Sequence, residues 1–148
     1  MQPPSTRNGT SELVLSRALR AELVQLARLA EPREACGVLL GRREEDRVVL
    51  LGVRAARNLR VADGTMRFEL DPGALVAITD EAGALGLEVV GVFHSHPRGP
   101  AVPSEADRAA AWEGWSYLIV GRADDGDELR SWRALAEGFR EERVLESR

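Results

Sequence analysis

The stretch His94-Ser95-His96-Pro97-Arg98-Gly99-Pro100-Ala101-Val102-Pro103-Ser104-Glu105-Ala106-Asp107 decides both the fold and the chemistry of this chain. It follows an apolar run, residues 87–93, that has the length and composition of a buried strand. In an extended backbone residues i and i+2 point to the same face, so the imidazoles of His94 and His96 can converge on one metal ion. The carboxylate of Asp107 returns where a helix is expected to begin. Two nitrogens and one oxygen leave a fourth tetrahedral position open, which is typical of a catalytic zinc site.

The residues between His96 and Asp107 suit a loop that folds back over the histidines. Four of them make this connection stiff and rich in turns: Pro97, Gly99, Pro100 and Pro103. Ser104 stands where a helix N-cap is expected, and Asp107, three residues later, completes a pair that resembles a capping box. The helix dipole also favours an acidic ligand in the first turn.

The pattern His94-x-His96-Pro97, six residues, Ser104, two residues and Asp107 resembles the signature of the JAMM (MPN-plus) zinc metalloprotease family. That family also requires a glutamate on an upstream strand, and Glu34 is similar in position. The match extends over roughly residues 13–135. The resemblance implies a stand-alone prokaryotic-type member with an α/β (α+β) fold: a single MPN/deaminase-like domain with a curved mixed sheet flanked by helices.

The same resemblance implies an enzyme, a JAMM-type, deubiquitinase-like isopeptidase with one zinc ion per chain. His94, His96 and Asp107 would be the metal ligands. Glu34 would act as general base, and the hydroxyl of Ser104 would support the oxyanion. The implied partner and substrate is a ubiquitin-fold or sulfur-carrier protein, cut at the peptide or isopeptide bond after its C-terminal Gly-Gly. The residues that bind this substrate are not indicated by the sequence.

Each residue also has a structural interpretation. A single histidine is more often a core or surface residue than a ligand, and only the joint spacing favours ligation. Ser104 can be a helix cap without any role in catalysis. An acid at the start of a strand is usually solvated, but Glu34 enters the apolar run 36–40, where a buried carboxylate needs a partner. Cys36, on the same strand face, is interpreted as a small packing residue.

Two other classes of protein remain as alternatives. A non-catalytic MPN scaffold would organise a complex, but scaffolds usually lack the ligands that are intact here. A RadC-like domain associated with DNA repair carries a similar His-x-His-Pro loop. The net charge of −4 argues against it, because no broad basic surface is available for nucleic acid.

The composition indicates the cellular compartment in which the protein is expected. A single cysteine excludes an internal disulfide and favours a reducing compartment, so we expect a cytoplasmic protein. The polar N-terminus lacks the apolar core of a signal peptide, and no apolar run approaches the roughly 20 residues that span a bilayer. We therefore expect no membrane partner. All twenty basic residues are arginine. The oligomeric state is left open.

The chain is expected to comprise a flexible N-terminal arm (1–11), one metalloprotease domain (12–136) and a charged C-terminal tail or helix (137–148). Within the domain, leucines between residues 13 and 29 recur at helical spacing and predict a first helix that ends before Pro32. Further helices are predicted over 72–85 and 104–112. Strands are predicted over 35–40, 47–53, 66–70, 87–93, 117–120 and 128–132.

Overall fold

A computed structural model describes residues 11–59 and 69–147 of the chain. Its strands and helices follow in this order: β1 (Glu12–Ser16), α1 (Arg17–Ala30), β2 (Cys36–Glu44), β3 (Arg47–Ala56), α2 (Pro72–Ala84), β4 (Glu88–Ser95), α3 (Glu105–Ala109), β5 (Ser116–Ala123), β6 (Gly126–Leu135) and β7 (Gly138–Ser147). Residues 66–68 of the predicted strand over 66–70 lie outside the described residues; Leu70 forms an isolated bridge to Asn58.

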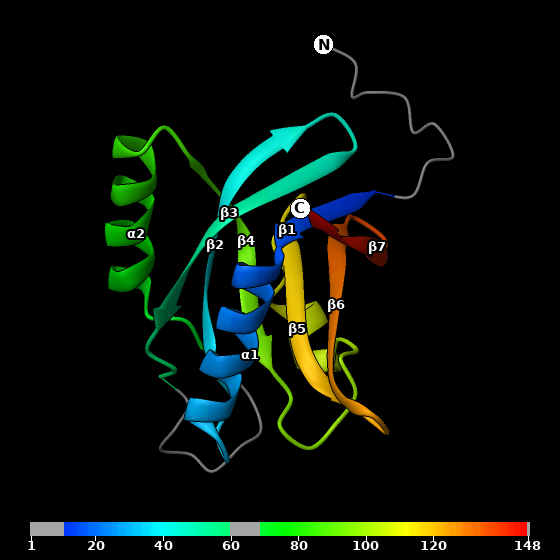
Figure 1. The fold of residues 1–148 in the computed structure, drawn as a ribbon. Coiled ribbons are helices and arrows are strands. Elements are labelled where there is room, and N and C mark those ends of the chain that lie inside the picture. Colours follow the sequence, from blue (N-terminus) through cyan, green and yellow to red (C-terminus); the bar gives the residue numbers. More distant parts are fainter. Residues whose placement is uncertain (1–10, 60–68, 148) are drawn as a thin grey trace.

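The seven strands form one mixed sheet that closes into a barrel in the order β1-β3-β2-β4-β5-β6-β7 (Figure 1). β1 pairs in parallel with both β3 and β7, and β4 pairs in parallel with β5. The remaining neighbours are antiparallel. The predicted fold class, a curved mixed sheet flanked by helices, is confirmed, and the curvature is strong enough to close the sheet.

Successive residues of β2 face two different cores. Leu39 packs with Leu23 and Ala27 of α1 in the larger core, whereas Val38 and Leu40 pack with Ile78 and Ala82 of α2. The two helices therefore cover opposite faces of this strand (Figure 1). Burial on both faces explains why this strand reads as a continuous apolar run instead of an alternating one.

The prediction of a single first helix through the leucines of residues 13–29 is wrong at its N-terminal end. Leu13 and Leu15 lie on β1, where their spacing of two places both side chains in the barrel core. The helix α1 begins only after Ser16, whose Oγ accepts a hydrogen bond from the N–H of Leu19 at 3.1 Å.

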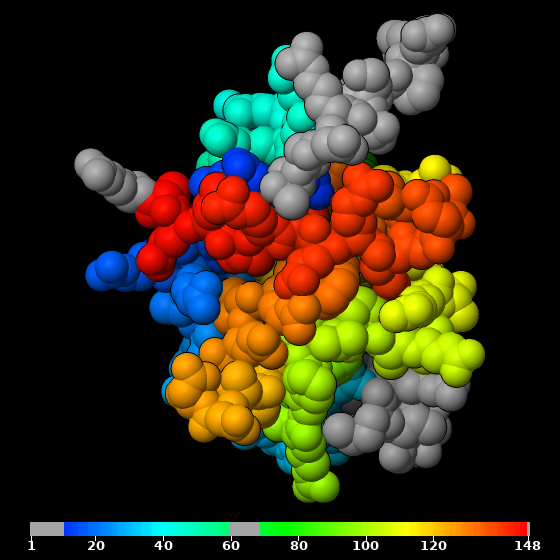
Figure 2. Space-filling view, turned by 90° about the vertical axis from the view of Figure 1, so that its right-hand side faces the viewer, coloured from blue at the N-terminus to red at the C-terminus, as the bar shows by residue number. Residues whose placement is uncertain are grey.

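The prediction of a charged tail or helix for residues 137–148 is also wrong, because residues 138–147 form β7. This strand pairs with β6 on one side and with β1 on the other, and so closes the barrel. Figure 2 shows it in red and orange-red, lying across the surface beside β6. The predicted arm, residues 1–11, lies outside the described residues except for Ser11. Within the described residues, no helix combines the length and apolar character needed to cross a membrane.

Candidate metal centre

The loop after β4 is held in place by the neighbouring strands β5 and β6. The N–H of His96 donates to the carbonyl oxygen of Val120 at 2.8 Å, and the N–H of Arg122 donates to that of Gly99 at 2.7 Å. Farther along, the indole Nε1 of Trp132 donates to the carbonyl oxygen of Ala101 at 3.0 Å. The loop predicted from its prolines is therefore bonded along its length and has a defined path back toward the histidines.

A glycine on β5 makes room for this path. A Cβ atom at Gly121 would collide with the backbone nitrogen of Ala101, so any larger residue would push the loop away from the strand. Because His96 and Asp107 lie on either side of this segment, its close approach helps to set their separation.

Three candidate ligand atoms meet where β4, the loop and α3 converge. His94 Nε2 lies 3.1 Å from His96 Nε2 and 3.2 Å from Asp107 Oδ2, and His96 Nε2 lies 3.5 Å from the same oxygen. Ligands about 2.0–2.2 Å from a tetrahedral zinc ion are separated from one another by about 3.3–3.6 Å, close to these distances. The three atoms therefore have the spacing that zinc requires.

Glu34 stands beside this cluster. Its Oε1 lies 3.8 Å from His96 Nε2, and the ligand atoms of Glu34, His94 and His96 all lie within 4.8 Å of one another, so this group could hold a metal ion. Asp107 Oδ2 is closer to both imidazoles than Glu34 is to His96. Distances alone therefore favour Asp107 over Glu34 as the third ligand.

Among the residues that the structure describes, one carboxylate oxygen of Glu34 finds no hydrogen-bond partner. The side chain is 2% exposed, and no group in the described part of the chain bonds to Oε2. A buried carboxylate oxygen without a partner is costly in a folded protein. Its position next to the three ligand atoms fits a site where metal or water would occupy the adjoining space.

The tautomer of His96 follows from its second nitrogen. Nδ1 lies 2.9 Å from the carbonyl oxygen of Pro100, which can only accept a hydrogen bond. In the neutral ring, Nδ1 therefore carries the proton and Nε2 keeps its lone pair toward His94 and Asp107. A backbone carbonyl commonly orients metal-binding histidines in this way.

Burial and hydrogen bonding displace the pKa values in the cluster. Burial lowers the pKa of His94, against the effect of its hydrogen bond with Asp107. Burial also opposes protonation of His96, but its hydrogen bonds with Asp107 and the carbonyl of Pro100 raise its pKa overall. Burial by itself would raise the pKa of Asp107, yet its close contacts with His94 and His96 hold it well below its usual value. Asp107 is thus ionised over the whole physiological pH range.

Burial raises the pKa of Glu34 to about 7; the charge on His96 lowers it and that on Asp107 raises it further. A carboxyl group with a pKa near neutrality can both accept and donate a proton at that pH. The surroundings of Glu34 therefore suit proton transfer.

Ser104 and Asp107 form the predicted capping box at the start of α3. The N–H of Asp107 donates to Ser104 Oγ at 3.1 Å, and the N–H of Ser104 donates to Asp107 Oδ2 at 2.7 Å. The second bond fixes the oxygen that also faces the two histidines. Ser104 itself is exposed.

Two residues that the sequence did not single out hold Glu34 in place. Ser95 lies between the two histidines, and its Oγ accepts a hydrogen bond from the N–H of Ala35 at 2.8 Å. The side-chain amide of Asn58 donates to the carbonyl oxygen of Glu34 at 3.3 Å. A serine inside a buried strand between two candidate ligands is a signal that could have identified Ser95. Asn58 has no comparable local signal.

Cys36 packs against the site without joining it. Its Sγ lies 3.6 Å from the carbonyl oxygen of Ala56. Burial, and then the nearby charge of Glu34, raises the pKa of the thiol to about 12. The neutral thiol is a poor ligand, in agreement with its interpretation as a packing residue.

Comparison with known proteins defines the class of this fold and site. The sequence profile of the family described as prokaryotic homologs of the JAB domain matches residues 16–135. The chain therefore belongs to this family, and the resemblance to JAMM metalloproteases is confirmed.

Individual relatives agree with that assignment. The chain is 36% identical over 114 residues to a Desampylase of Haloferax volcanii, covering 72% of this chain and 80% of that protein. It is 36% identical to a probable TtuB-protein conjugate cleaving protease of Thermus thermophilus, covering 69% of this chain and 62% of that protein. The solution structure of a Desulfitobacterium hafniense protein superposes with a TM-score of 0.81 at 31% identity, covering 91% and 92% of the two chains.

Proposed function

We propose that this chain is a zinc-dependent metalloprotease that hydrolyses a peptide or isopeptide bond after the C-terminal Gly-Gly of a ubiquitin-like or sulfur-carrier protein. The observation that carries the proposal is the convergence of His94, His96 and Asp107 beside the buried carboxylate of Glu34. The Thermus thermophilus relative is named for the cleavage of protein conjugates, and this supports the proposed substrate class.

His94, His96 and Asp107 would hold one zinc ion per chain. Bound there, zinc would supply Lewis acidity, lowering the pKa of water to about 7 and polarising the scissile carbonyl. The lowered pKa of His94 and that of Asp107 keep both residues in the forms that bind metal.

Glu34 would move the proton in this reaction. Its Oε2, which has no partner within residues 11–59 and 69–147, takes a proton from the attacking water and delivers it to the leaving nitrogen. The water oxygen joins the carbonyl carbon, and the carbon–nitrogen bond then breaks, giving an amine and a carboxylic acid that loses the remaining water proton to solvent. A pKa of about 7 suits both halves of this transfer.

Ser104 would stabilise the developing oxyanion through its hydroxyl while it caps α3. The two roles are compatible, because Ser104 Oγ accepts a bond from the N–H of Asp107 and keeps its own proton to donate. Glycine on the acyl side of the bond would let the substrate backbone approach the buried cluster closely, since it carries no side chain. The proposed partner is thus a protein tail, not nucleic acid, and the single buried cysteine supports a reducing, cytoplasmic setting.

The substrate is tested with a ubiquitin-fold carrier extended beyond its Gly-Gly, incubated with the zinc-loaded protein and followed by mass spectrometry. We expect cleavage directly after the second glycine and no comparable cleavage of casein. A carrier in which both glycines are alanines is the matched control and should stay intact. Equal cleavage of casein, or of the alanine carrier, would contradict the proposal.

The metal is tested by elemental analysis of the purified, zinc-loaded protein. We expect close to one zinc per chain, and less than about a tenth of that for His96→Ala and Asp107→Ala. Glu34→Gln should keep its zinc and lose hydrolysis, because it removes the base and leaves all three ligands. Zinc-free wild-type protein after incubation with zinc would rule the site out.

A further inference from the structure

Two separate hollows adjoin the cluster, and each is lined by a different member of the site. The hollow on the Glu34 side measures about 370 Å³ and lies between α1, β2 and β3. The hollow on the Asp107 side measures about 770 Å³ and lies between the start of α2 and the segment from α3 to β5. Among the described residues, none lines both.

The Asp107-side hollow is apolar, with exposed aromatic and aliphatic walls. Trp112, 55% exposed, packs its ring 4.6 Å from that of Trp115, and Val76, 63% exposed, belongs to the opposite wall. The N–H of Trp112 donates to the hydroxyl of Tyr117 at 2.6 Å, which fixes the backbone that presents the indole. Of the described residues that line it, the two charged ones, Glu69 and Asp107, are both acidic.

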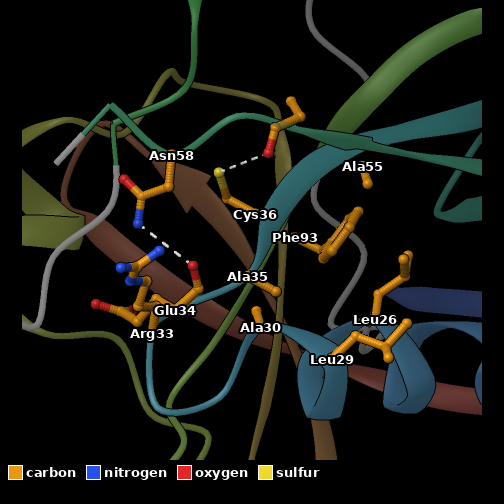
Figure 3. Close-up of a pocket in the computed structure, with 11 residues that line it drawn as sticks. Leu26, Leu29, Ala30, Arg33, Glu34, Ala35, Cys36, Ala55, Asn58 and Phe93 are labelled. Atoms are coloured by element: carbon orange, nitrogen blue, oxygen red, sulfur yellow. Dashed lines mark hydrogen bonds between the residues drawn. The ribbon is translucent and has the colours of Figure 1, made fainter. Parts of the chain in front are cut away.

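The Glu34-side hollow is smaller and is bordered by helix α1. Figure 3 shows Leu26 and Leu29 of α1 at one end, and Glu34 with Asn58 at the other. Leu29 is 72% exposed, so this wall carries an apolar side chain at least as exposed as Trp112 in the other hollow.

We infer that substrate crosses the cluster in one direction, with the carrier tail in the Asp107-side hollow and the leaving amine on the Glu34 side. This inference rests on the proposed function. A proton must reach the leaving nitrogen, and Glu34, the group proposed to deliver it, lines only the smaller hollow. The acyl part of the substrate therefore extends to the other side, past Asp107.

The residues that line the Asp107-side hollow also define which substrate tail fits there. The two glycines carry no side chain, so the residue before them is the first that can fill a pocket, about 7 Å along an extended chain from the scissile carbonyl. Trp112 and Val76 favour a large apolar side chain at this position. Glu69 at the edge favours a neighbouring basic residue over an acidic one.

The test is the binding of cleaved-tail peptides to the zinc-loaded full chain, measured by fluorescence anisotropy. One labelled peptide ends in Leu-Gly-Gly and the other in Ala-Gly-Gly, with a basic residue before each. We expect the leucine peptide to bind at least about fivefold more tightly. Trp112→Ala should weaken its binding about tenfold or more and remove most of the preference for leucine. Val76→Asp should act in the same direction, and Trp112→Phe should retain most of the affinity.

Leu29→Ala is the matched control, because it truncates an equally exposed side chain on the other hollow; it should change tail binding by less than twofold. No measurable binding, equal binding of both peptides, or a loss with Leu29→Ala but not with Trp112→Ala would overturn the inference. The proposed function fails separately: a wild-type protein that binds tails in this pattern without cleaving an extended carrier would refute hydrolysis alone.

Discussion

Ser95 and Ala35 are joined by two hydrogen bonds of opposite direction. The N–H of Ser95 donates to the carbonyl oxygen of Ala35 at 3.0 Å, and the N–H of Ala35 donates to Ser95 Oγ at 2.8 Å. Ser95 stands between the two histidines, and Ala35 directly follows Glu34. This pair of bonds therefore ties the proposed base to the proposed ligands across two strands that are far apart in the sequence.

Ser95→Ala should remove one of these two hydrogen bonds and leave the N–H of Ala35 without its acceptor. We expect kcat to fall about tenfold to 100-fold with KM within twofold of wild type, because small displacements of a catalytic group are costly. Zinc content should not change. The measurements are steady-state kinetics on an extended carrier and elemental analysis.

Ser116→Ala provides the comparison for Ser95→Ala. Ser116 is also completely buried, but its Oγ has no hydrogen-bond partner in the described part of the chain. Its removal should leave kcat unchanged. A similar loss of kcat in both variants, or a loss of zinc from Ser95→Ala, would show that Ser95 acts through general packing.

The raised pKa of Glu34 predicts how the stability of the metal-free protein depends on pH. With a pKa of about 7 when folded against 4.5 as the reference, the folded chain binds more protons between these pH values. The free energy of unfolding should therefore fall as pH rises from 4.5 to 7, by up to about 3 kcal/mol from this one group.

Glu34→Gln removes this loss. Urea unfolding of the metal-free proteins should show the variant gaining up to about 3 kcal/mol on wild type between pH 4 and pH 8. Exposed Glu113→Gln should show the same difference from wild type at both pH values. A gap between Glu34→Gln and wild type that does not change with pH would mean that the buried carboxyl keeps its ordinary pKa.

Two substitutions of Ser104 separate its capping role from a catalytic one. Ser104→Asn keeps an acceptor for the N–H of Asp107 but lacks a hydroxyl, whereas Ser104→Thr keeps both. If the hydroxyl stabilises the oxyanion, kcat should fall about 100-fold in the asparagine variant and stay within about fivefold in the threonine variant. Stability of the two should agree within about 1 kcal/mol. Equal kcat in the asparagine and threonine variants would mean that Ser104 acts only as a helix cap.

The convergence of His94, His96 and Asp107 could be predicted from the sequence because its parts are local. An i, i+2 histidine pair and a capping box are short-range patterns, and the structure brings their side chains together as the spacing required. Glu34 needed the family resemblance, since the contact of β2 with β4 that brings it to the histidines is long-range. Ser95 has its role only through that same contact.

The closure of the barrel could not be predicted in this way. β1 is five residues long and is followed at once by a helix. Its two leucines therefore continue the helical spacing of the leucines in α1 when only the sequence is considered. β7 is dominated by charged residues because much of it faces solvent. β1 and β7 stabilise each other by pairing, and this pairing joins the two ends of the domain, so no local sequence pattern indicates it.

The most informative residue of β7 is Glu142, an acid that is 2% exposed. It accepts hydrogen bonds from Ser131 Oγ at 2.9 Å and from Arg133 Nη2 at 2.7 Å. Its neighbour Glu141 pairs with Arg130 at 2.7 Å on the exposed side of the strand. Glu142→Ala should lower the free energy of unfolding by about 3–5 kcal/mol, because it leaves the charge of Arg133 without its buried partner. Glu141→Ala should lower it by less than about 1 kcal/mol. Denaturant unfolding of both metal-free variants measures the difference, and equal losses would mean that β7 is held by its backbone ladder and not by this buried pair.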